Sequence, residues 1–326
     1  MRKTPGILAA SALVLTLAAC AAPSGPAIDG GSPVDPGRCT PVSERGGLAA
    51  DVEASGDFGA TPLEAEFPTP LVSRTETSSA VLDAGEGPVV GPNDNVAGSI
   101  TILDGVSGTV LTQTNGVTII PLTADDTPFF RPAVCATVGS RIATVGTSSV
   151  VLGEAFVSAY GIDPEMTVVS VLDVAGAYLS RAQGAPQLPQ NGLPTVSLAA
   201  NGQPGLSFTN AEPPSELRIE TLIAGNGTEV QDGDTVLVQY TGVIWDSREV
   251  FDSSWDKGAP AQFPTTGVVE GFSKALVGHR VGSQVLAAIP PAQGYGDNPP
   301  QGSGIGPDDT LVFVIDILGI VPATGG

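Results

Sequence analysis

Basic residues are scarce in this sequence of 326 residues. Lys and Arg together number 13, against 34 Asp and Glu, and the formal net charge at pH 7 is −21. This balance argues against nucleic-acid binding, because the phosphate backbone is neutralised by Lys and Arg. It also disfavours adsorption to anionic lipid headgroups. We interpret the acidity as surface charge that keeps the protein soluble.

Long apolar runs are equally scarce. The run Ile7–Ala19 follows the basic residues Arg2 and Lys3, and it has the length of a signal peptide rather than of a membrane span. It leads into Leu17-Ala18-Ala19-Cys20, which resembles the cleavage box of bacterial lipoproteins, in which the Cys becomes the diacylated first residue. The alternative is a Cys that falls there by chance.

The targeting prediction follows from this box. We expect residues 1–20 to be a lipoprotein signal peptide, with Cys20 as the lipidated residue. Residues 21–38, rich in Ala, Pro, Gly and Ser, are expected to be a flexible tether. The protein would lie on the extracytoplasmic face of the cell membrane and touch the bilayer only through its lipid anchor.

Cys and His number 3 and 1 in the chain. With Cys20 acylated, Cys39 and Cys135 remain. Two thiols in an exported protein more often form a disulfide than bind a metal, and no His or further Cys lies near enough in the sequence to complete a metal site. We predict a disulfide between Cys39 and Cys135, with two unpaired buried thiols as the alternative. His279 is expected to be a surface residue.

The chain repeats itself at a spacing of about 140 residues. Three pairs of segments match in the same order: LDAGEGPVVGPNDNV (82–96) with LIAGNGTEVQDGDTV (222–236), VGSRIATV (138–145) with VGSQVLAA (281–288), and MTVVSVLDV (166–174) with DTLVFVIDI (309–317). Three matches in register indicate two copies of one domain. Residues 182–214 between them, rich in Pro, Gly, Asn and Gln, are predicted to be a linker with at most one strand.

The second copy has the pattern of an α+β domain. Alternating or β-branched runs predict strands at 217–222, 235–243, 281–289 and 311–317. One short helix is predicted over 271–277, with Gly278 as its C-terminal cap. Residues 246–267 and 291–309 are predicted to be long loops. The expected domain is an antiparallel sheet curved around one short helix, with both loops at one end.

Five segments of the second copy resemble the FKBP family of peptidyl-prolyl cis-trans isomerases. They are VQYTG (238–242), FDSS (251–254), VVEGF (268–272), VGSQVLAAIPPAQGYG (281–296) and DDTLVFVIDIL (308–318), in family order with near-family spacing. The resemblance implies two tandem FKBP-like domains: residues 215–322 as the isomerase and residues 39–181 as a degenerate copy. It implies no cofactor and no metal.

The resemblance also implies a proline pocket. Its catalytic residues would be Tyr240, Asp252 and Tyr295, and its substrate-binding residues Phe251, Val268, Val269, Phe272, Ile305 and Phe313. Phe272 would form the floor, while the Tyr295 hydroxyl and the Ile305 backbone N–H would donate to substrate carbonyls. Two departures from the family would either loosen the pocket or change its preference for the residue before proline: Ala261 replaces a frequent Phe wall, and the stretch 263–268 is about two residues short.

An apolar pocket suits this reaction on physical grounds. Rotation of an X–Pro bond meets a resonance barrier of ~18–20 kcal/mol, and no bond has to break. A twisted amide is less polar than a planar one, so a dry aromatic cavity favours the twisted state. We interpret Asp252 as a residue that orders the pocket or polarises the carbonyl, and not as a general base.

The first copy keeps the scaffold motifs and loses the pocket aromatics. Ile100 stands where the second copy has Tyr240, nothing like FDSS follows, and only Tyr160-Gly161 hints at the loop tip. We expect this copy to be catalytically silent and used for spacing, docking or client binding.

Three functions remain open at this point. The first is an extracytoplasmic isomerase, expected to be a monomer, that acts on proline-containing segments of exported proteins after translocation. The second is a non-catalytic chaperone or tether that binds Pro-containing peptides. The third, a solute-binding lipoprotein, lacks the two large α/β lobes that such proteins need.

Overall fold

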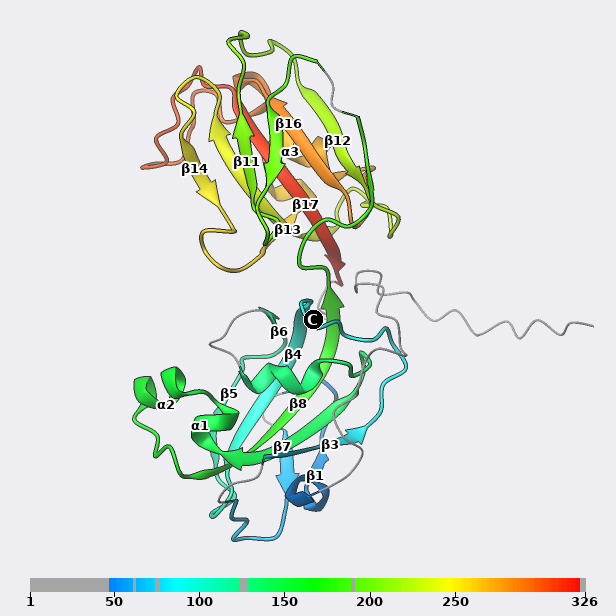
Figure 1. Ribbon diagram of the computed structural model, residues 1–326, viewed down its shortest axis with the longest axis vertical. Coiled ribbons are helices and arrows are strands. Elements are labelled where there is room, and N and C mark those ends of the chain that lie inside the picture. The colour runs from blue at the N-terminus through cyan, green and yellow to red at the C-terminus, as the bar shows by residue number, and fades with distance from the viewer. Residues whose placement is uncertain (1–46, 61–62, 74–76, 123–127, 189–190, 323–326) are drawn as a thin grey trace, which may run out of the picture.

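The computed structural model describes residues 47–60, 63–73, 77–122, 128–188 and 191–322. The predicted signal peptide and tether, with Cys20 and Cys39, lie outside the described residues. Two large antiparallel sheets lie one above the other in Figure 1, and the chain passes from β8 of the first directly to the second. Among the described residues, no helix is long and apolar enough to cross a membrane.

The first sheet has the strand order β3-β7-β8-β4-β5, with β6 also paired to β4. Its strands are β3 (Ser78–Asp83), β4 (Asn95–Asp104), β5 (Val110–Gln113), β6 (Thr118–Pro121), β7 (Arg141–Thr147) and β8 (Thr167–Tyr178). Before it come the 3-10 helix η2 (Gly47–Asp51) and a small hairpin of β1 (Glu53–Ser55) and β2 (Glu64–Glu66). Its other helices are η3 (Pro128–Ala133), α1 (Ser148–Val151) and α2 (Glu154–Tyr160).

The second sheet has the order β14-β13-β17-β16-β12-β9, with β15 paired to β13. Its strands are β9 (Ala185–Pro186), β12 (Arg218–Ala224), β13 (Thr235–Ile244), β14 (Val250–Ser253), β15 (Ala261–Pro264), β16 (Gln284–Ile289) and β17 (Leu311–Val321). Its helices are η4 (Thr265–Gly267), α3 (Glu270–Leu276) and η5 (Pro291–Gln293). The hairpin of β10 (Thr195–Leu198) and β11 (Pro204–Ser207) forms a separate two-stranded sheet.

The two large sheets share their strand pairing and their irregularities. The β-bulge between Val81 and Asp83 in β3 recurs between Thr221 and Ile223 in β12. The bulge between Ala97 and Gly98 in β4 recurs between Leu237 and Val238 in β13. Bulges shift the register of every residue that follows. The sequence repeat therefore corresponds to two sheets that are equivalent residue by residue.

One helix packs against the second sheet, as predicted. Helix α3 is followed by Gly278 with φ +83°, the left-handed conformation of a C-terminal glycine cap. Gly271 allows the helix to lie close to the sheet, since a Cβ there would stand 2.4 Å from an Ile289 side-chain carbon. The prediction that an equivalent short α-helix also packs against the first sheet was wrong. The equivalent segment is the 3-10 helix η3, whose internal Pro132 opposes an α-helix.

The outer face of each sheet carries a small hairpin, which the sequence prediction missed. Residues 182–214 were expected to be a linker with at most one strand, yet they contain β9, β10 and β11. Phe208 packs edge-on against buried Trp245 at 5.5 Å between ring centroids, and Leu193 joins the same apolar cluster. Trp245 is 1% exposed and donates its indole N–H to the Ala211 carbonyl. This stretch therefore contributes to the hydrophobic interior of the second sheet.

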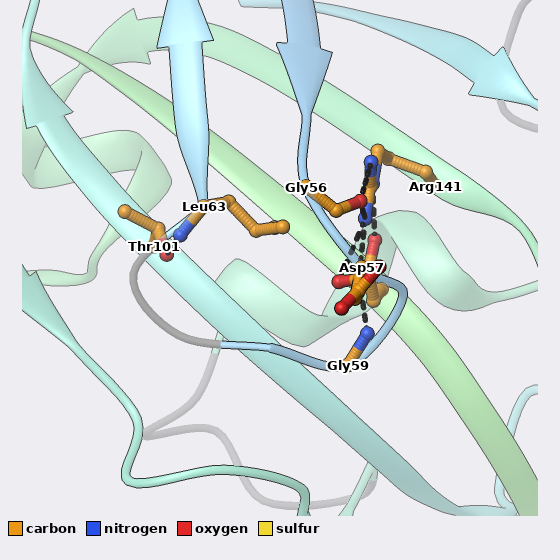
Figure 2. A network of polar contacts seen from close by, with 7 residues as sticks. Gly56, Asp57, Gly59, Leu63, Thr101 and Arg141 are labelled. Atoms are coloured by element: carbon orange, nitrogen blue, oxygen red, sulfur yellow. Dashed lines mark hydrogen bonds and ion pairs between the residues drawn. The ribbon is translucent and has the colours of Figure 1, made fainter.

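A buried ion pair holds the hairpin of the first sheet. Arg141 donates from Nε and Nη2 to Asp173 at 2.7 and 2.9 Å, and Gly59 N donates to Asp173 Oδ2 at 2.7 Å (Figure 2). The Arg141 guanidinium also donates to the Gly56 carbonyl at 3.3 Å. Nearby, Leu63 N donates to Thr101 Oγ1 on β4 at 3.3 Å. The hairpin is therefore fixed by charge as well as by apolar contacts.

In the second sheet, the equivalent buried aspartate, Asp316, has an uncharged glutamine as its partner in place of an arginine. Gln284 stands in register opposite Asp316, as Arg141 does opposite Asp173. Asp316 accepts hydrogen bonds from Gln284 Nε2 at 2.7 Å and from Ala182 N at 2.8 Å. Burial raises the pKa of Asp316 to about 6. This carboxyl group holds the segment that joins the two sheets.

Candidate functional site

The loops 246–267 and 291–309 meet the inner face of the second sheet at a cavity of about 410 Å³. The first of these regions was predicted to be one long loop, but it contains β14, β15 and η4. The cavity lining is mostly aromatic and aliphatic: Tyr240, Phe251, Asp252, Phe263, Gly267, Val268, Val269, Phe272, Tyr295 and Phe313. Its volume lies in the range of pockets that bind small groups.

Strand register places the aromatic side chains on one face. Gly242 on β13 pairs with Phe313 on β17, so Tyr240 and Phe313 point to the same side as diagonal neighbours. Phe272 reaches this face from α3, with its ring centroid 5.0 Å from Phe313 and 6.1 Å from Tyr240. Phe251 on β14 lies edge-on to Phe313 at 5.5 Å. The rings form one continuous apolar surface.

Gly242 makes this arrangement possible. A Cβ there would lie 2.6 Å from a ring carbon of Phe251 and 2.9 Å from one of Phe313. Both distances are shorter than non-bonded carbons allow, so any larger residue would displace the two rings. The glycine of VQYTG is therefore part of the pocket.

One carboxylate lies at the rim of the cavity. Tyr240 donates its hydroxyl hydrogen to Asp252 Oδ2 at 2.6 Å, and Lys257 Nζ forms an ion pair with Asp252 Oδ1. Burial alone would raise the pKa of Asp252, but the hydrogen bonds from Lys257 and Tyr240 hold it below its ordinary value. Asp252 is therefore ionised at neutral pH.

The two tyrosines of the cavity stay neutral. Burial, together with the Asp252 carboxylate, raises the pKa of Tyr240 well above its ordinary value. Burial and the same carboxylate raise the pKa of Tyr295. Both hydroxyl groups therefore remain protonated donors at neutral pH, and the arrangement offers hydrogen bonds in an apolar cavity rather than a proton-transfer pair.

All residues predicted for the proline pocket except Ile305 line the cavity. Ile305 is 9% exposed and joins the same apolar cluster, but its backbone N–H donates to Ser303 Oγ at 3.3 Å. The predicted donor to a substrate carbonyl is thus engaged within its own loop. The other eight predicted pocket residues lie together in the cavity lining.

Phe263 and Gly267 are the two lining residues that the sequence prediction missed, and Phe263 is the one that brings an aromatic side chain. Phe263 stands two residues after Ala261 on β15, on the same face, and its ring centroid lies 5.6 Å from those of both Tyr240 and Phe272. The alternation of β15 could have revealed it, since residues two apart on a strand share a face. The wall expected to be absent at Ala261 is therefore supplied by Phe263.

Among the described residues, the strands of the first sheet carry no aromatic side chain at the positions equivalent to the pocket. The strand register gives the first-sheet equivalents of four pocket residues. Ile100 corresponds to Tyr240 and Thr112 to Asp252. Ile120 corresponds to Phe263 and Ser170 to Phe313. The space next to the sheet contains Phe130, which is 0% exposed and packs in the apolar core.

Two other predictions concern Cys135 and His279. Cys135 is disulfide-bonded, while Cys39, its predicted partner, lies outside the described residues. His279 was expected at the surface, but it is half-buried, and burial lowers its pKa. Among the described residues, no group of three or more His, Cys, Asp and Glu is placed to hold a metal ion.

Comparisons with known proteins show the family of the chain. Residues 226–318 match the family model of FKBP-type peptidyl-prolyl cis-trans isomerases. The chain is 37% identical over 120 residues to an FK506-binding protein of Streptomyces anulatus, covering 36% of this chain and 97% of that relative. It is 38% identical over 117 residues to a probable FK506-binding protein of Corynebacterium glutamicum, covering 36% and 97%. The crystal structure of FkpA from Escherichia coli matches with 32% identity and a TM-score of 0.31, covering 40% of this chain and 53% of that one.

The chain therefore belongs to the FKBP family of peptidyl-prolyl cis-trans isomerases. The resemblance inferred from the five segments is confirmed, and so is the prediction that the chain is an isomerase.

Proposed function

We propose that the second sheet and its pocket catalyse cis-trans isomerisation of X–Pro bonds in exported proteins, from the extracytoplasmic face of a membrane. The single observation that carries this proposal is the aromatic cavity around Tyr240, Phe272 and Phe313, with the Asp252 carboxylate at its rim. Its volume of about 410 Å³ leaves room for a proline ring and the bond that precedes it.

The pocket acts by environment rather than by bond chemistry. In the planar ground state the amide is strongly polar, and entering an apolar cavity costs it hydration. In the twisted state the nitrogen lone pair is no longer shared with the carbonyl, and the group is less polar. The rings around Phe272 therefore stabilise the twisted state relative to the planar one. A thousandfold acceleration needs only about 4 kcal/mol of such preference.

The polar groups orient the peptide. The neutral Tyr295 hydroxyl is a donor within the cavity, available for a substrate carbonyl. Tyr240 donates to Asp252, which holds the Tyr240 ring in place. The Ile305 N–H becomes a donor to the substrate when its 3.3 Å bond to Ser303 is exchanged for one to the peptide.

Export and anchoring rest on the sequence. The segment Leu17-Ala18-Ala19-Cys20 supports lipidation at Cys20, and the disulfide at Cys135 fits an oxidising compartment outside the cytoplasm. Replacing Cys20 with Ser should move the protein from the membrane fraction to the soluble fraction of cells, with its isomerase activity retained. Membrane attachment that survives this substitution would contradict the lipid anchor.

The first sheet supports a second FKBP-like domain without activity. Its pairing and bulges repeat those of the second sheet, while Thr112 and Ser170 replace Asp252 and Phe313. Such a domain, spanning about residues 39–181, would serve for spacing, docking or client binding.

The test is a protease-free isomerisation assay on a Phe-Pro tetrapeptide with the full chain. We expect acceleration by the wild type and at least about a tenfold loss in the Phe272→Ala, Tyr295→Ala double variant, because the floor and one donor are removed. Tyr160→Phe, at a tyrosine that is 70% exposed on α2, is the control and should keep full activity. Peptide binding without acceleration by the wild type would favour the non-catalytic chaperone or tether.

A further inference from the structure

A second cavity, of about 460 Å³, lies between the two sheets. Asn95 of β4 and Asn93 in the turn before it line one side of the cavity, and Gln239 of β13 and Trp255 in the turn after β14 line the other. The third wall is the turn of the β10–β11 hairpin, with Asn201. It shares no lining residue with the proline pocket.

The lining of this cavity is rich in side-chain amides. Asn95 is 1% exposed and uses its Nδ2 to donate to the Leu179 carbonyl at 2.6 Å, which leaves its carbonyl oxygen as an acceptor. Gln239 is 8% exposed and uses its carbonyl oxygen to accept from Ser254 Oγ, which leaves its N–H groups as donors. A peptide backbone carries one donor and one acceptor per residue, and this pair complements both.

The charge and the aromatic side chain of the cavity fit the same ligand. Arg181 is the one ionisable group in the lining, and it donates to the Ala200 carbonyl at 3.3 Å. One engaged cation in a chain of net charge −21 does not make a site for a polyanion. Half-buried Trp255 offers an apolar face and an indole N–H, which suits side chains and carbonyls of a polypeptide.

One loop separates the two cavities. Asp252 lines the proline pocket, and Trp255, three residues later, lines the second cavity. Three residues span at most about 11 Å, so the two cavities lie within the length of a few extended residues of one another. The loop is also tied to the hairpin, since Gln203 Nε2 donates to Asp256 Oδ1 at 2.9 Å.

We propose that the cavity between the sheets is a second binding site for the client polypeptide, which holds an extended segment a few residues away from the proline. This inference rests on the proposed isomerase function and adds to it: clients long enough to reach both cavities bind better than short peptides. It also gives the hairpin and the first sheet a part in substrate binding, since both line the site.

The experiment compares two substrates on the full chain. One is the Phe-Pro tetrapeptide, and the other is a peptide of about twelve uncharged residues with Phe-Pro at its centre. For the wild type we expect kcat/KM to be about tenfold higher for the long peptide, as one or two additional hydrogen bonds supply. In Trp255→Ala and in Arg181→Ala the ratio between the substrates should fall towards one. Arg280→Ala, at an exposed arginine outside both cavities, is the matched control and should keep the wild-type ratio.

A binding signal gives a second measurement that does not depend on turnover. Trp245 is enclosed under the hairpin, so a change in tryptophan fluorescence on adding peptide reports on Trp255. We expect the long peptide to change the emission and Trp255→Phe to abolish that change. A wild type that turns over both peptides with equal kcat/KM and shows no change in emission would overturn the second site while the isomerase stands. A wild type inactive on the tetrapeptide would refute the isomerase itself.

Discussion

The hydrogen bond between Tyr240 and Asp252 allows a direct test of how the pocket works. Tyr240→Phe removes the hydroxyl that donates to Asp252 at 2.6 Å, and Asp252→Asn removes the charge that accepts it. A hydrogen bond to a charged group contributes about 1.5–3 kcal/mol, and the lower end applies here because the Asp252 side chain is 34% exposed. Each single variant should therefore lose roughly tenfold in kcat/KM.

The double variant distinguishes positioning from independent roles. If the carboxylate acts by holding the Tyr240 ring, both substitutions remove the same contact, and the double variant should be no slower than the slower single variant. Tyr160→Phe serves as the control for loss of a tyrosine hydroxyl at an exposed position. The assay is the tetrapeptide isomerisation, with circular dichroism to verify folding.

The pH profile provides an independent check. The pKa of Asp252 is held below its ordinary value, while those of Tyr240 and Tyr295 are raised above theirs. None of these groups should change charge between about pH 5 and 9, so kcat/KM should be flat over that range. Additive losses in the double variant, or an inflection of the profile that Asp252→Asn abolishes, would refute this reasoning and point to proton transfer by Asp252.

Three further predictions concern packing and buried charge. Gly242→Ala should lower kcat/KM at least about tenfold, because the added Cβ would displace Phe251 and Phe313. The control is Gly205→Ala in the exposed hairpin, which should keep its kcat/KM because the atom nearest to its added Cβ would be 3.6 Å away. Equal activity of the two variants would contradict the role of Gly242. Burial raises the pKa of Asp316 to about 6, so the folded protein binds this proton more tightly than the unfolded chain, and the free energy of unfolding should gain about 1.4 kcal/mol from this group as pH falls from about 7 to 5. Urea titrations at both pH values should show this gain in the wild type and lose it in Asp316→Asn. Arg141→Leu should destabilise the first sheet by about 3–5 kcal/mol, because it leaves the buried Asp173 carboxylate without its cation, and Arg141→Gln should cost less, since Gln284 serves Asp316 in the same way. Calorimetry measures both losses, and an unchanged transition in Arg141→Leu would show that the pair contributes nothing.

The sequence by itself identified eight of the ten residues that line the proline pocket. Tyr240, Phe272 and Phe313 sit in strands and a helix that local periodicity predicts, and the five family segments fix their order. Phe251 sits on β14, in a stretch predicted to be a loop, and only the FDSS segment pointed to it. The repeat also indicated two copies of one domain, and the structure shows matching bulges in the equivalent strands β3 and β12. Local pattern determines which face a side chain takes once its strand is known.

Only the tertiary structure decided where the segments without a periodic pattern lie and what they contact. The stretch 182–214 lacks periodicity, yet it folds because Leu193 and Phe208 cover Trp245, a residue distant in sequence. Phe263 becomes a pocket wall through its pairing with β13, and the cavity around Gln239 exists only because two sheets and a hairpin meet there. Such contacts depend on residues far apart in the chain, whose juxtaposition no local periodicity encodes.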